Sequence, residues 1–256
     1  VLSIGIDPPA SHSGIHLPQA SDVKSVFTRR GALPHKSSTG ALLVVGGAPA
    51  YFGAPRLSAE AAMRAGAGLV ALAVPRSIMG AIASQLPEAI YSPLNDSDPR
   101  RAASEVRKTL AQDRFRALLV GPGLGQDEAA TDLMEALFGR SFTQNQRTPV
   151  GFGIPDRILD PSNDADDRLP VQAIVVDADG LNWLSKQDTW VERLADYEAV
   201  LTPHAGELAR LRNVEVLDIV RHPFDAARSA AVDWRQVVVL KCGYSCVATP
   251  DGGRLR

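Results

Sequence analysis

Residues 202–207 include side chains that could take part in binding or catalysis, and they join an apolar run to a helix pattern. The apolar run at 199–201 predicts the end of a buried strand, and residues 205–211 predict a short helix. The first backbone N–H groups of a helix have no partner within it, so such a helix start attracts anions. His204 stands at this helix start, and Glu207 lies in the first turn, where a carboxylate complements the helix dipole. The alternative is an ordinary helix start with His204 exposed in a loop.

Two glycine-rich stretches also follow apolar runs. Residues 46–47 and 53–55 bracket a loop, where the missing side chains either let a ligand approach the backbone or form a tight turn. No Gly-Lys-Ser/Thr follows, so this is not a phosphate loop of the G-x-x-x-x-G-K-[ST] type. Residues 121–125 read G-x-G-x-G, which differs from the G-x-G-x-x-G pattern of Rossmann dinucleotide binding.

Several charged residues stand at the ends of predicted strands. Asp177 and Asp179 are two apart, and paired carboxylates there could hold a magnesium ion with phosphates. In the other interpretation Asp179 caps the next helix and Asp177 bonds local N–H groups. We favour this interpretation for Asp179 and leave Asp177 open. His35 and Lys36 supply an imidazole and a positive charge, or belong to a surface loop. Lys241 either faces a phosphate or is solvated. No Ser-His-Asp or Cys-His set stands out by spacing.

The elements that must position these residues alternate along the chain. Apolar runs predict strands at 41–45, 69–74, 90–91, 115–120, 173–176, 199–201 and 237–240, the last paired as a hairpin with 246–249. Helices are predicted at 56–65, 77–83, 98–110, 127–137, 190–194, 205–211 and 224–234. Strands that are apolar on both faces indicate an α/β fold, a three-layer αβα sandwich around a mainly parallel sheet. Ligands bind such sheets at the carboxyl ends of the strands, where these motifs stand.

Composition limits the partners and the compartment. The chain has 256 residues, with 27 basic and 29 acidic side chains and a net charge of −2, so nucleic acid and anionic membrane surfaces are not expected partners. No apolar run reaches membrane-spanning length. The two cysteines, Cys242 and Cys246, form neither a disulfide framework nor a zinc site, which favours a reducing cytoplasm.

The sequence predicts a short N-terminal segment followed by one large domain. Residues 1–30, rich in Ser, Pro and His, predict a linker or the tail of an upstream domain. Residues 31–256 predict one domain, with an insertion at about 139–170 that is polar and acidic. The chain starts at Val1 and stops at Arg256, just after a turn that would lead into a strand. We therefore expect a domain that is incomplete at its C-terminus.

Taken in order, the loop motifs resemble one family. They read H-K-S-S-T-G, G-G-A-P-A-Y-F-G-A-P, R-A-G-A-G-L-V, G-P-G-L-G, V-D-A-D-G-L-N, L-T-P-H-A-G-E and L-K-C-G-Y-S-C-V-A-T-P-D-G. From about residue 33 onward the chain looks like the ADP/ATP-dependent NAD(P)H-hydrate dehydratases of the ribokinase-like superfamily. The opening V-L-S-I-G-I-D-P is similar to the closing strand of the epimerase domain that is often fused upstream.

The resemblance implies a metabolite-repair reaction. In this family ADP or ATP, with Mg²⁺, phosphorylates the hydroxyl of hydrated NADH or NADPH, and loss of phosphate then restores the nicotinamide ring. It also implies a homo-oligomer. Two alternatives are kept: a non-catalytic nucleotide-binding relative, and a ribokinase-like kinase of another small alcohol.

The resemblance also assigns residues. It implies that the hydrated dinucleotide contacts Ala54, Gly123 and His204, and that the cleft is also lined by His35, Lys36 and Asp177. It places the adenine nucleotide against Lys241, Cys242, Gly243, Tyr244 and Ser245. The family usually has Gly at position 242 and Thr at position 245. Its catalytic Asp lies in a G-[TS]-G-D motif that would come after Arg256, so we expect residues 1–256 alone to be inactive.

Overall fold

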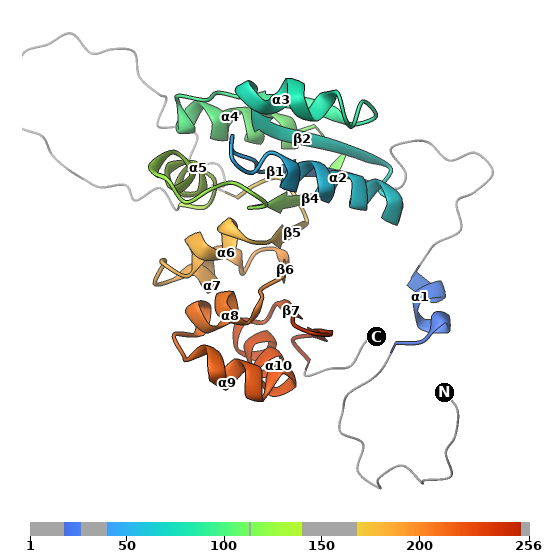
Figure 1. The fold of residues 1–256 in the computed structure, drawn as a ribbon, viewed down its shortest axis with the longest axis vertical. Helices are drawn as coiled ribbons and strands as arrows, with labels where there is room; N and C mark the ends of the chain where they lie inside the picture. The colour runs from blue at the N-terminus through green and yellow to red at the C-terminus, as the bar shows by residue number, and fades with distance from the viewer. Residues whose placement is uncertain (1–17, 27–39, 113, 140–167, 252–256) are drawn as a thin grey trace, which may run out of the picture.

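An eight-stranded sheet forms the centre of the protein in a computed structural model that describes residues 18–26, 40–112, 114–139 and 168–251 (Figure 1). Its strand order is β3-β2-β1-β4-β5-β6-β7-β8. Every neighbouring pair is parallel except β7 and β8, which form an antiparallel hairpin. The predicted α/β fold with a mainly parallel sheet is confirmed. The strands are β1 Ala41–Val45, β2 Leu69–Pro75, β3 Ile90–Leu94, β4 Phe115–Val120, β5 Ala173–Val176, β6 Glu198–Leu201, β7 Val237–Lys241 and β8 Ser245–Ala248.

The helices follow the predicted positions, with three additions. They are α1 Ala20–Val26, α2 Gly53–Ala65, α3 Arg76–Ala83, α4 Pro99–Leu110, α5 Glu128–Phe138, α6 Asp179–Leu184, α7 Trp190–Leu194, α8 Ala205–Arg212, α9 Val216–Arg221 and α10 Pro223–Trp234. Our predicted elements did not include α1, α6 and α9, which are 7, 6 and 6 residues long. Helices this short show hardly two turns of periodicity, so their sequence pattern is weak.

Two segments of the predicted domain plan differ from the structure or extend beyond it. Residues 1–30 stay predicted as a linker or the tail of an upstream domain, and their described part contains α1, which lies apart from the sheet (Figure 1). Of the predicted insertion at 139–170, only residue 139 and residues 168–170 are described. Leu169 is fully buried, and its backbone N–H donates to the Tyr197 hydroxyl over 2.7 Å. The C-terminal end of the predicted insertion is therefore anchored in the core.

Side chains that alternate along the strands build two cores. Val44 and Leu72 point to one face of the sheet, where α3 contributes Ile82. Leu43 and Leu118 point to the other face and join the larger core, to which α4, α5, α6, α8 and α10 contribute. Helices therefore cover both faces over β1 and β2, as a three-layer sandwich requires.

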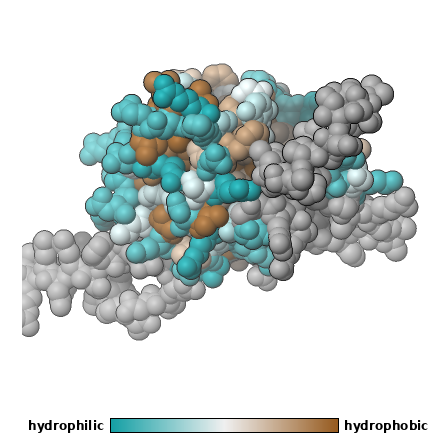
Figure 2. All heavy atoms as spheres, turned by 90° about the horizontal axis from the view of Figure 1, so that it is seen from below, coloured by the Kyte–Doolittle hydropathy of each residue, from teal (hydrophilic) through white to brown (hydrophobic). Residues whose placement is uncertain are grey.

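The face of the sheet that carries Val44 and Leu72 is more open toward the β8 edge. Val175, Val200 and Val239 alternate onto this face and are only partly buried, and Val247 on β8 is 59% exposed. Seen from below, the molecule also presents apolar side chains scattered among hydrophilic ones (Figure 2). Among the described residues, no helix combines the length and apolar character needed to cross a bilayer.

Short loops connect the strands to the helices at the carboxyl edge of the sheet, and Gly121 shows how tightly they pack. Its φ of 115° lies in the region that favours glycine. A Cβ atom there would overlap the Asp177 carbonyl oxygen and lie 2.6 Å from the Gly180 backbone nitrogen. The loop after β4 can therefore lie against the loop after β5 only because residue 121 has no side chain.

The substitution Gly121→Ala tests this close packing. We expect it to lower the free energy of unfolding by about 2–4 kcal/mol, because the new methyl group meets backbone atoms and φ becomes strained. Gly80→Ala is the matched control, since a Cβ atom at Gly80, within α3, meets nothing within 4 Å. This control should raise stability by about 0.5–1 kcal/mol. Denaturant titration measures both values, and equal effects of the two substitutions would contradict the packing argument.

Candidate active site

Five loops with predicted chemistry lie along one edge of the sheet. They follow β1, β4, β5, β6 and β7, which are consecutive neighbours in the sheet and parallel to one another. Because parallel strands have their carboxyl ends on the same side, residues far apart in sequence meet there. His35 and Lys36, which were predicted to line the same cleft, lie outside the described residues.

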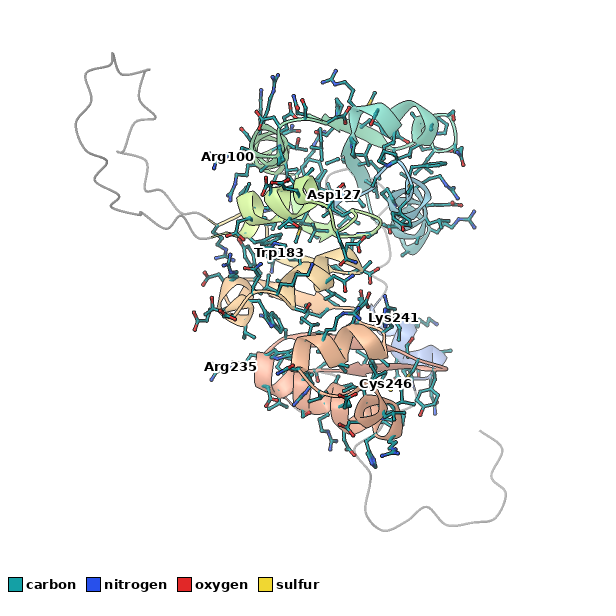
Figure 3. The ribbon with its side chains drawn as sticks, turned by 60° about the vertical axis from the view of Figure 1, so that its left-hand side comes forward. Arg100, Asp127, Trp183, Arg235, Lys241 and Cys246 are labelled. Carbon is teal, nitrogen blue, oxygen red and sulfur yellow. The ribbon has the colours of Figure 1, made fainter. Side chains whose placement is uncertain are left out.

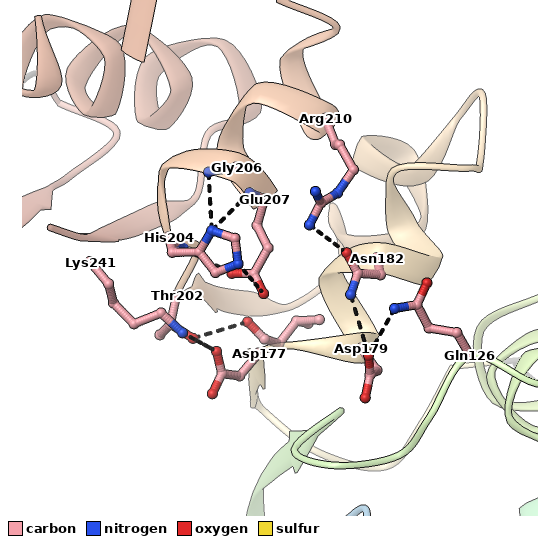
Figure 4. A network of polar contacts seen from close by, with 11 residues as sticks. Gln126, Asp177, Asp179, Asn182, Thr202, His204, Gly206, Glu207, Arg210 and Lys241 are labelled. Atoms are coloured by element: carbon pink, nitrogen blue, oxygen red, sulfur yellow. Dashed lines mark hydrogen bonds and ion pairs between the residues drawn. The ribbon is translucent and has the colours of Figure 1, made fainter. Parts of the chain in front are cut away.

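A three-residue polar cluster joins the ends of β5, β6 and β7 (Figure 4). The Lys241 ammonium Nζ lies 2.6 Å from Asp177 Oδ1, and the Thr202 hydroxyl donates to the same oxygen over 2.8 Å. The Lys241 backbone N–H donates to the Pro203 carbonyl over 2.7 Å, which extends the parallel pairing of β6 and β7 into the loop. Asp177 therefore does not bond local N–H groups, and the cluster holds a fixed ammonium at the sheet edge.

Partial exposure leaves this cluster able to meet a ligand. The Lys241 side chain is 42% exposed and the Asp177 side chain 30%. A half-exposed ion pair adds little to stability because water screens it. Its larger effect is geometric, because the hydrogen-bonded carboxylate restricts where the ammonium can lie.

His204 caps α8 with its own ring. Nδ1 of His204 accepts the backbone N–H groups of Gly206 and Glu207 over 3.0 and 3.3 Å. Glu207, which is buried, accepts the His204 backbone N–H over 2.8 Å and completes a capping box. Nε2 of His204 lies 3.3 Å from Glu207 Oε1. Because Nδ1 is an acceptor here, the proton of a neutral ring belongs on Nε2.

This cap changes the predicted chemistry of the stretch at 202–207. We expected free N–H groups at the helix start to attract an anion, but the His204 ring occupies two of them. The ordinary helix-start alternative is thus correct for those N–H groups. The His204 side chain remains 53% exposed, beside Lys241, with which His204 forms an isolated parallel bridge. Contact with a ligand would have to come through the exposed part of the ring.

Asp179 differs from its predicted role. The N-cap of α6 is Ala178, with a φ of 48°, and no side chain caps this helix. Asp179 is instead the first residue of α6, and its Oδ2 accepts the Gly125 backbone N–H over 2.9 Å. The prediction that Asp179 caps the next helix is therefore wrong. Its carboxylate instead accepts a hydrogen bond from the loop after β4, which tertiary folding brings beside it.

A second polar chain extends from Asp179 to α8 (Figure 4). Asp179 Oδ1 accepts from the side-chain amides of Gln126 and Asn182, each over 3.3 Å, and Arg210 Nη2 donates to Asn182 Oδ1 over 2.9 Å. Our sequence-based site did not include Gln126, Asn182 and Arg210. The one signal in the sequence was that Asp179 and Asn182 are three residues apart, a spacing that brings two side chains together on a helix.

The glycine loops pack against other parts of the chain. A Cβ atom at Gly46 would overlap the Pro122 carbonyl oxygen, and one at Gly47 would lie 3.0 Å from Pro55 Cγ. Close packing therefore accounts for both glycines without a ligand. Gly123, with a φ of 64°, would place a Cβ atom 3.0 Å from the Cβ of Ala54. Two residues predicted from separate motifs to share one ligand are thus neighbours.

The predicted nucleotide loop is the turn between β7 and β8. Its residues are exposed, from Lys241 to Ser245. Tyr244 stacks on Phe224 of α10, with ring centroids 5.4 Å apart and planes 16° apart. The Cys242 thiol donates to the Tyr244 carbonyl oxygen over 2.5 Å. The exposed Cys242 side chain therefore lies against the backbone of the turn.

The described residues contain no group of three or more His, Cys, Asp or Glu side chains that could hold a metal ion. The arrangement instead provides a fixed ammonium, an imidazole edge and exposed loop backbone. Groups of this kind suit a bound phosphate or nucleotide better than a resident metal centre.

Solved structures place the fold in a known class. A ribokinase-like superfamily protein from Enterococcus faecalis aligns with a TM-score of 0.69 at 19% identity, over 95% of this chain and 72% of that one. An ADP/ATP-dependent NAD(P)H-hydrate dehydratase from Bacillus subtilis, co-crystallised with ATP and Mg²⁺, aligns with a TM-score of 0.66 at 23% identity, over 91% and 69%. The fold is therefore ribokinase-like.

Sequence comparison identifies the family within that class. A bifunctional NAD(P)H-hydrate repair enzyme from Moorella thermoacetica is 34% identical over 259 residues, which cover 98% of this chain but only 43% of that protein. The ADP-dependent (S)-NAD(P)H-hydrate dehydratase of Xanthomonas campestris is 30% identical over 92% of this chain and 71% of its own length. A family model described as NAD(P)H-hydrate dehydratase matches residues 42–144 and 160–255. The chain belongs to the NAD(P)H-hydrate dehydratase family.

Two substitutions separate the capping role of His204 from any other role. His204→Ala removes the acceptor for two helix N–H groups and should lower the free energy of unfolding by about 1 kcal/mol. His204→Asn replaces it with another good N-cap residue and should stay within about 0.5 kcal/mol of the parent protein. Thermal or denaturant unfolding measures the difference. If both substitutions cost the same, the ring would not be acting as the cap.

Proposed function

We propose that this protein takes part in repair of nicotinamide nucleotides, as an ADP- or ATP-dependent dehydratase of hydrated NADH or NADPH. The observation that carries the proposal is the meeting of Asp177, Thr202, His204 and Lys241 at one sheet edge, in a chain of this family. This chain spans less than half the length of the Moorella relative, so the activity of the whole protein is part of the proposal.

The chemistry explains why such a site needs a nucleotide. Hydroxide is a poor leaving group at neutral pH, whereas phosphate is a good one. The terminal phosphoryl group of ATP or ADP passes to the hydroxyl oxygen of the hydrated ring. The carbon–oxygen bond then breaks, phosphate departs, a proton leaves the neighbouring carbon, and the double bond returns. The protein mainly aligns the two substrates and stabilises phosphate charge.

Lys241 and its partners supply positive charge in this scheme. The ammonium sits 2.6 Å from Asp177, which also accepts the Thr202 hydroxyl, so its position is restricted before a phosphate arrives. A preorganised charge stabilises developing phosphate charge without reorganisation. Mg²⁺, when bound to the nucleotide phosphates, would supply further positive charge beside that of Lys241.

The remaining predicted residues divide between two substrates. Ala54 and Gly123, which are neighbours, contact the hydrated dinucleotide together with the exposed edge of His204. The turn Lys241 to Ser245, with the Tyr244 ring, holds the adenine nucleotide. We assign no residue of this sequence as the base for the hydroxyl. Homo-oligomeric assembly and a cytoplasmic location stay predictions.

An assay of nicotinamide repair tests the proposed activity. The complete gene product, given hydrated NADH and ATP or ADP, should restore the absorbance of the reduced nicotinamide and release one phosphate per turnover. Omission of the nucleotide is the control. Nucleotide binding without restoration would support the non-catalytic alternative, and stable phosphorylation of another alcohol would support the kinase alternative.

Nucleotide affinity tests the role of Lys241. Lys241→Gln removes the ammonium and leaves the Asp177 carboxylate to repel phosphate, so ATP should bind about tenfold more weakly or worse. Lys108→Gln makes the same chemical change on exposed α4, away from this edge, and should leave affinity unchanged. Calorimetric titration of both variants gives the two dissociation constants. Equal weakening would indicate that only net charge matters.

A further inference from the structure

Two thiols meet in the turn between β7 and β8. Cys246 lies on β8 opposite Leu240, and the Cys242 thiol lies 3.9 Å from the Leu240 carbonyl oxygen. Cys242 follows Leu240 by two positions, so the Cys242 thiol and the Cys246 side chain both lie beside the Leu240 position of the hairpin. Figure 3 shows Lys241 and Cys246 in this C-terminal part of the sheet. The chain has only these two cysteines, and both are free thiols.

The two thiols differ in environment. Cys242 is exposed, whereas Cys246 is 5% exposed. Burial raises the pKa of the Cys246 thiol to about 11, and the neighbouring Cys242 adds to this shift. Cys242 is the exposed thiol, so an external reagent meets it first.

We propose that Cys242 and Cys246 are a reversible oxidative modification site, which closes to a disulfide in the presence of a small-molecule disulfide such as oxidised glutathione. Cys242 acts as the entry thiol and Cys246 as the resolving thiol. The effect on nucleotide binding rests on the proposed function of the turn, whereas formation of the disulfide does not.

The reaction balances without any group beyond the named oxidant. The Cys242 thiolate attacks one sulfur of oxidised glutathione, the sulfur–sulfur bond breaks, and one glutathione leaves as a thiolate. Cys246 then gives its proton to solvent and attacks Cys242 Sγ, which releases the second glutathione. Two protein thiols are oxidised by two electrons, and one glutathione disulfide is reduced to two glutathione thiols.

Closing this bond changes the shape of the turn. Cys242 lies just after the end of β7, two positions after Leu240, the residue opposite Cys246, and diagonal positions in a regular sheet are about 7–8 Å apart. A disulfide prefers Cα atoms about 5.5–6 Å apart, so the turn must move toward β8. The thiol also leaves the Tyr244 carbonyl oxygen, its acceptor in the reduced form. We infer that oxidation shifts Tyr244 and weakens nucleotide binding.

Thiol counting and intact mass after incubation with oxidised glutathione test the modification. The chain should lose both free thiols and two hydrogen atoms, carry no glutathione at the end point, and recover on treatment with dithiothreitol. Cys246→Ala should stop at a single glutathione adduct, and Cys242→Ser should form no disulfide and react far more slowly. A persistent adduct on the parent chain, or no reaction under conditions that modify free cysteine, would overturn the proposal.

Titration of ATP into the reduced and oxidised forms tests the consequence. The oxidised form should bind about tenfold more weakly, as for loss of one well-made contact, and Cys242→Ser should bind equally well before and after oxidant. Equal affinity in the two forms would refute the regulatory effect. If the reduced form binds no ATP, the proposed nucleotide role of the turn fails, while the thiol count still decides whether the modification site exists.

Discussion

The parallel alignment of β5, β6 and β7 is the constraint on which the candidate site depends. It brings Asp177, Thr202 and Lys241 within hydrogen-bonding distance although up to 64 residues separate them in sequence. The alignment is itself held by Ile174, Leu201 and other fully buried apolar side chains. The polar cluster therefore contributes little to folding and takes its geometry from the sheet. When the charged group is already in place, less binding free energy is lost to ordering the site.

The loops at this edge satisfy their own polar groups before any ligand arrives. His204 covers two N–H groups of α8, and Asp179 covers the N–H of Gly125. Unpaired buried polar groups are costly, so a site made of loop backbone stays ordered when such partners are built in. What remains for a ligand is a small set of exposed atoms, among them the Lys241 ammonium and the edge of the His204 ring. This restriction favours one binding pose over many.

Local sequence patterns predicted most of the fold because they reflect short-range physics. The runs at β1 and β5 are uniformly apolar and the run at β4 is apolar except for Arg116, as is typical of strands covered on both faces, and their predicted bounds match the structure. Asp98 and Asp127 cap α4 and α5 with their own side chains, which is a local contact. The short helices α6 and α9 have no such periodic signal, and they form because tertiary packing buries residues such as Leu181 and Ile219.

The sequence by itself determined the α/β class, the order of the strands along the chain and the five loops that carry polar or glycine-rich motifs. Only the tertiary structure decided which of those residues face a ligand and which face the protein. Asp177 and Lys241 look like separate strand-end charges in the sequence, yet they form one ion pair. Asp179 and the Gly46 loop look like a cap and a ligand loop, yet they bind neighbouring loops instead. The physical reason is that a strand end fixes a residue's place at the sheet edge, whereas its contacts depend on segments that only folding brings beside it.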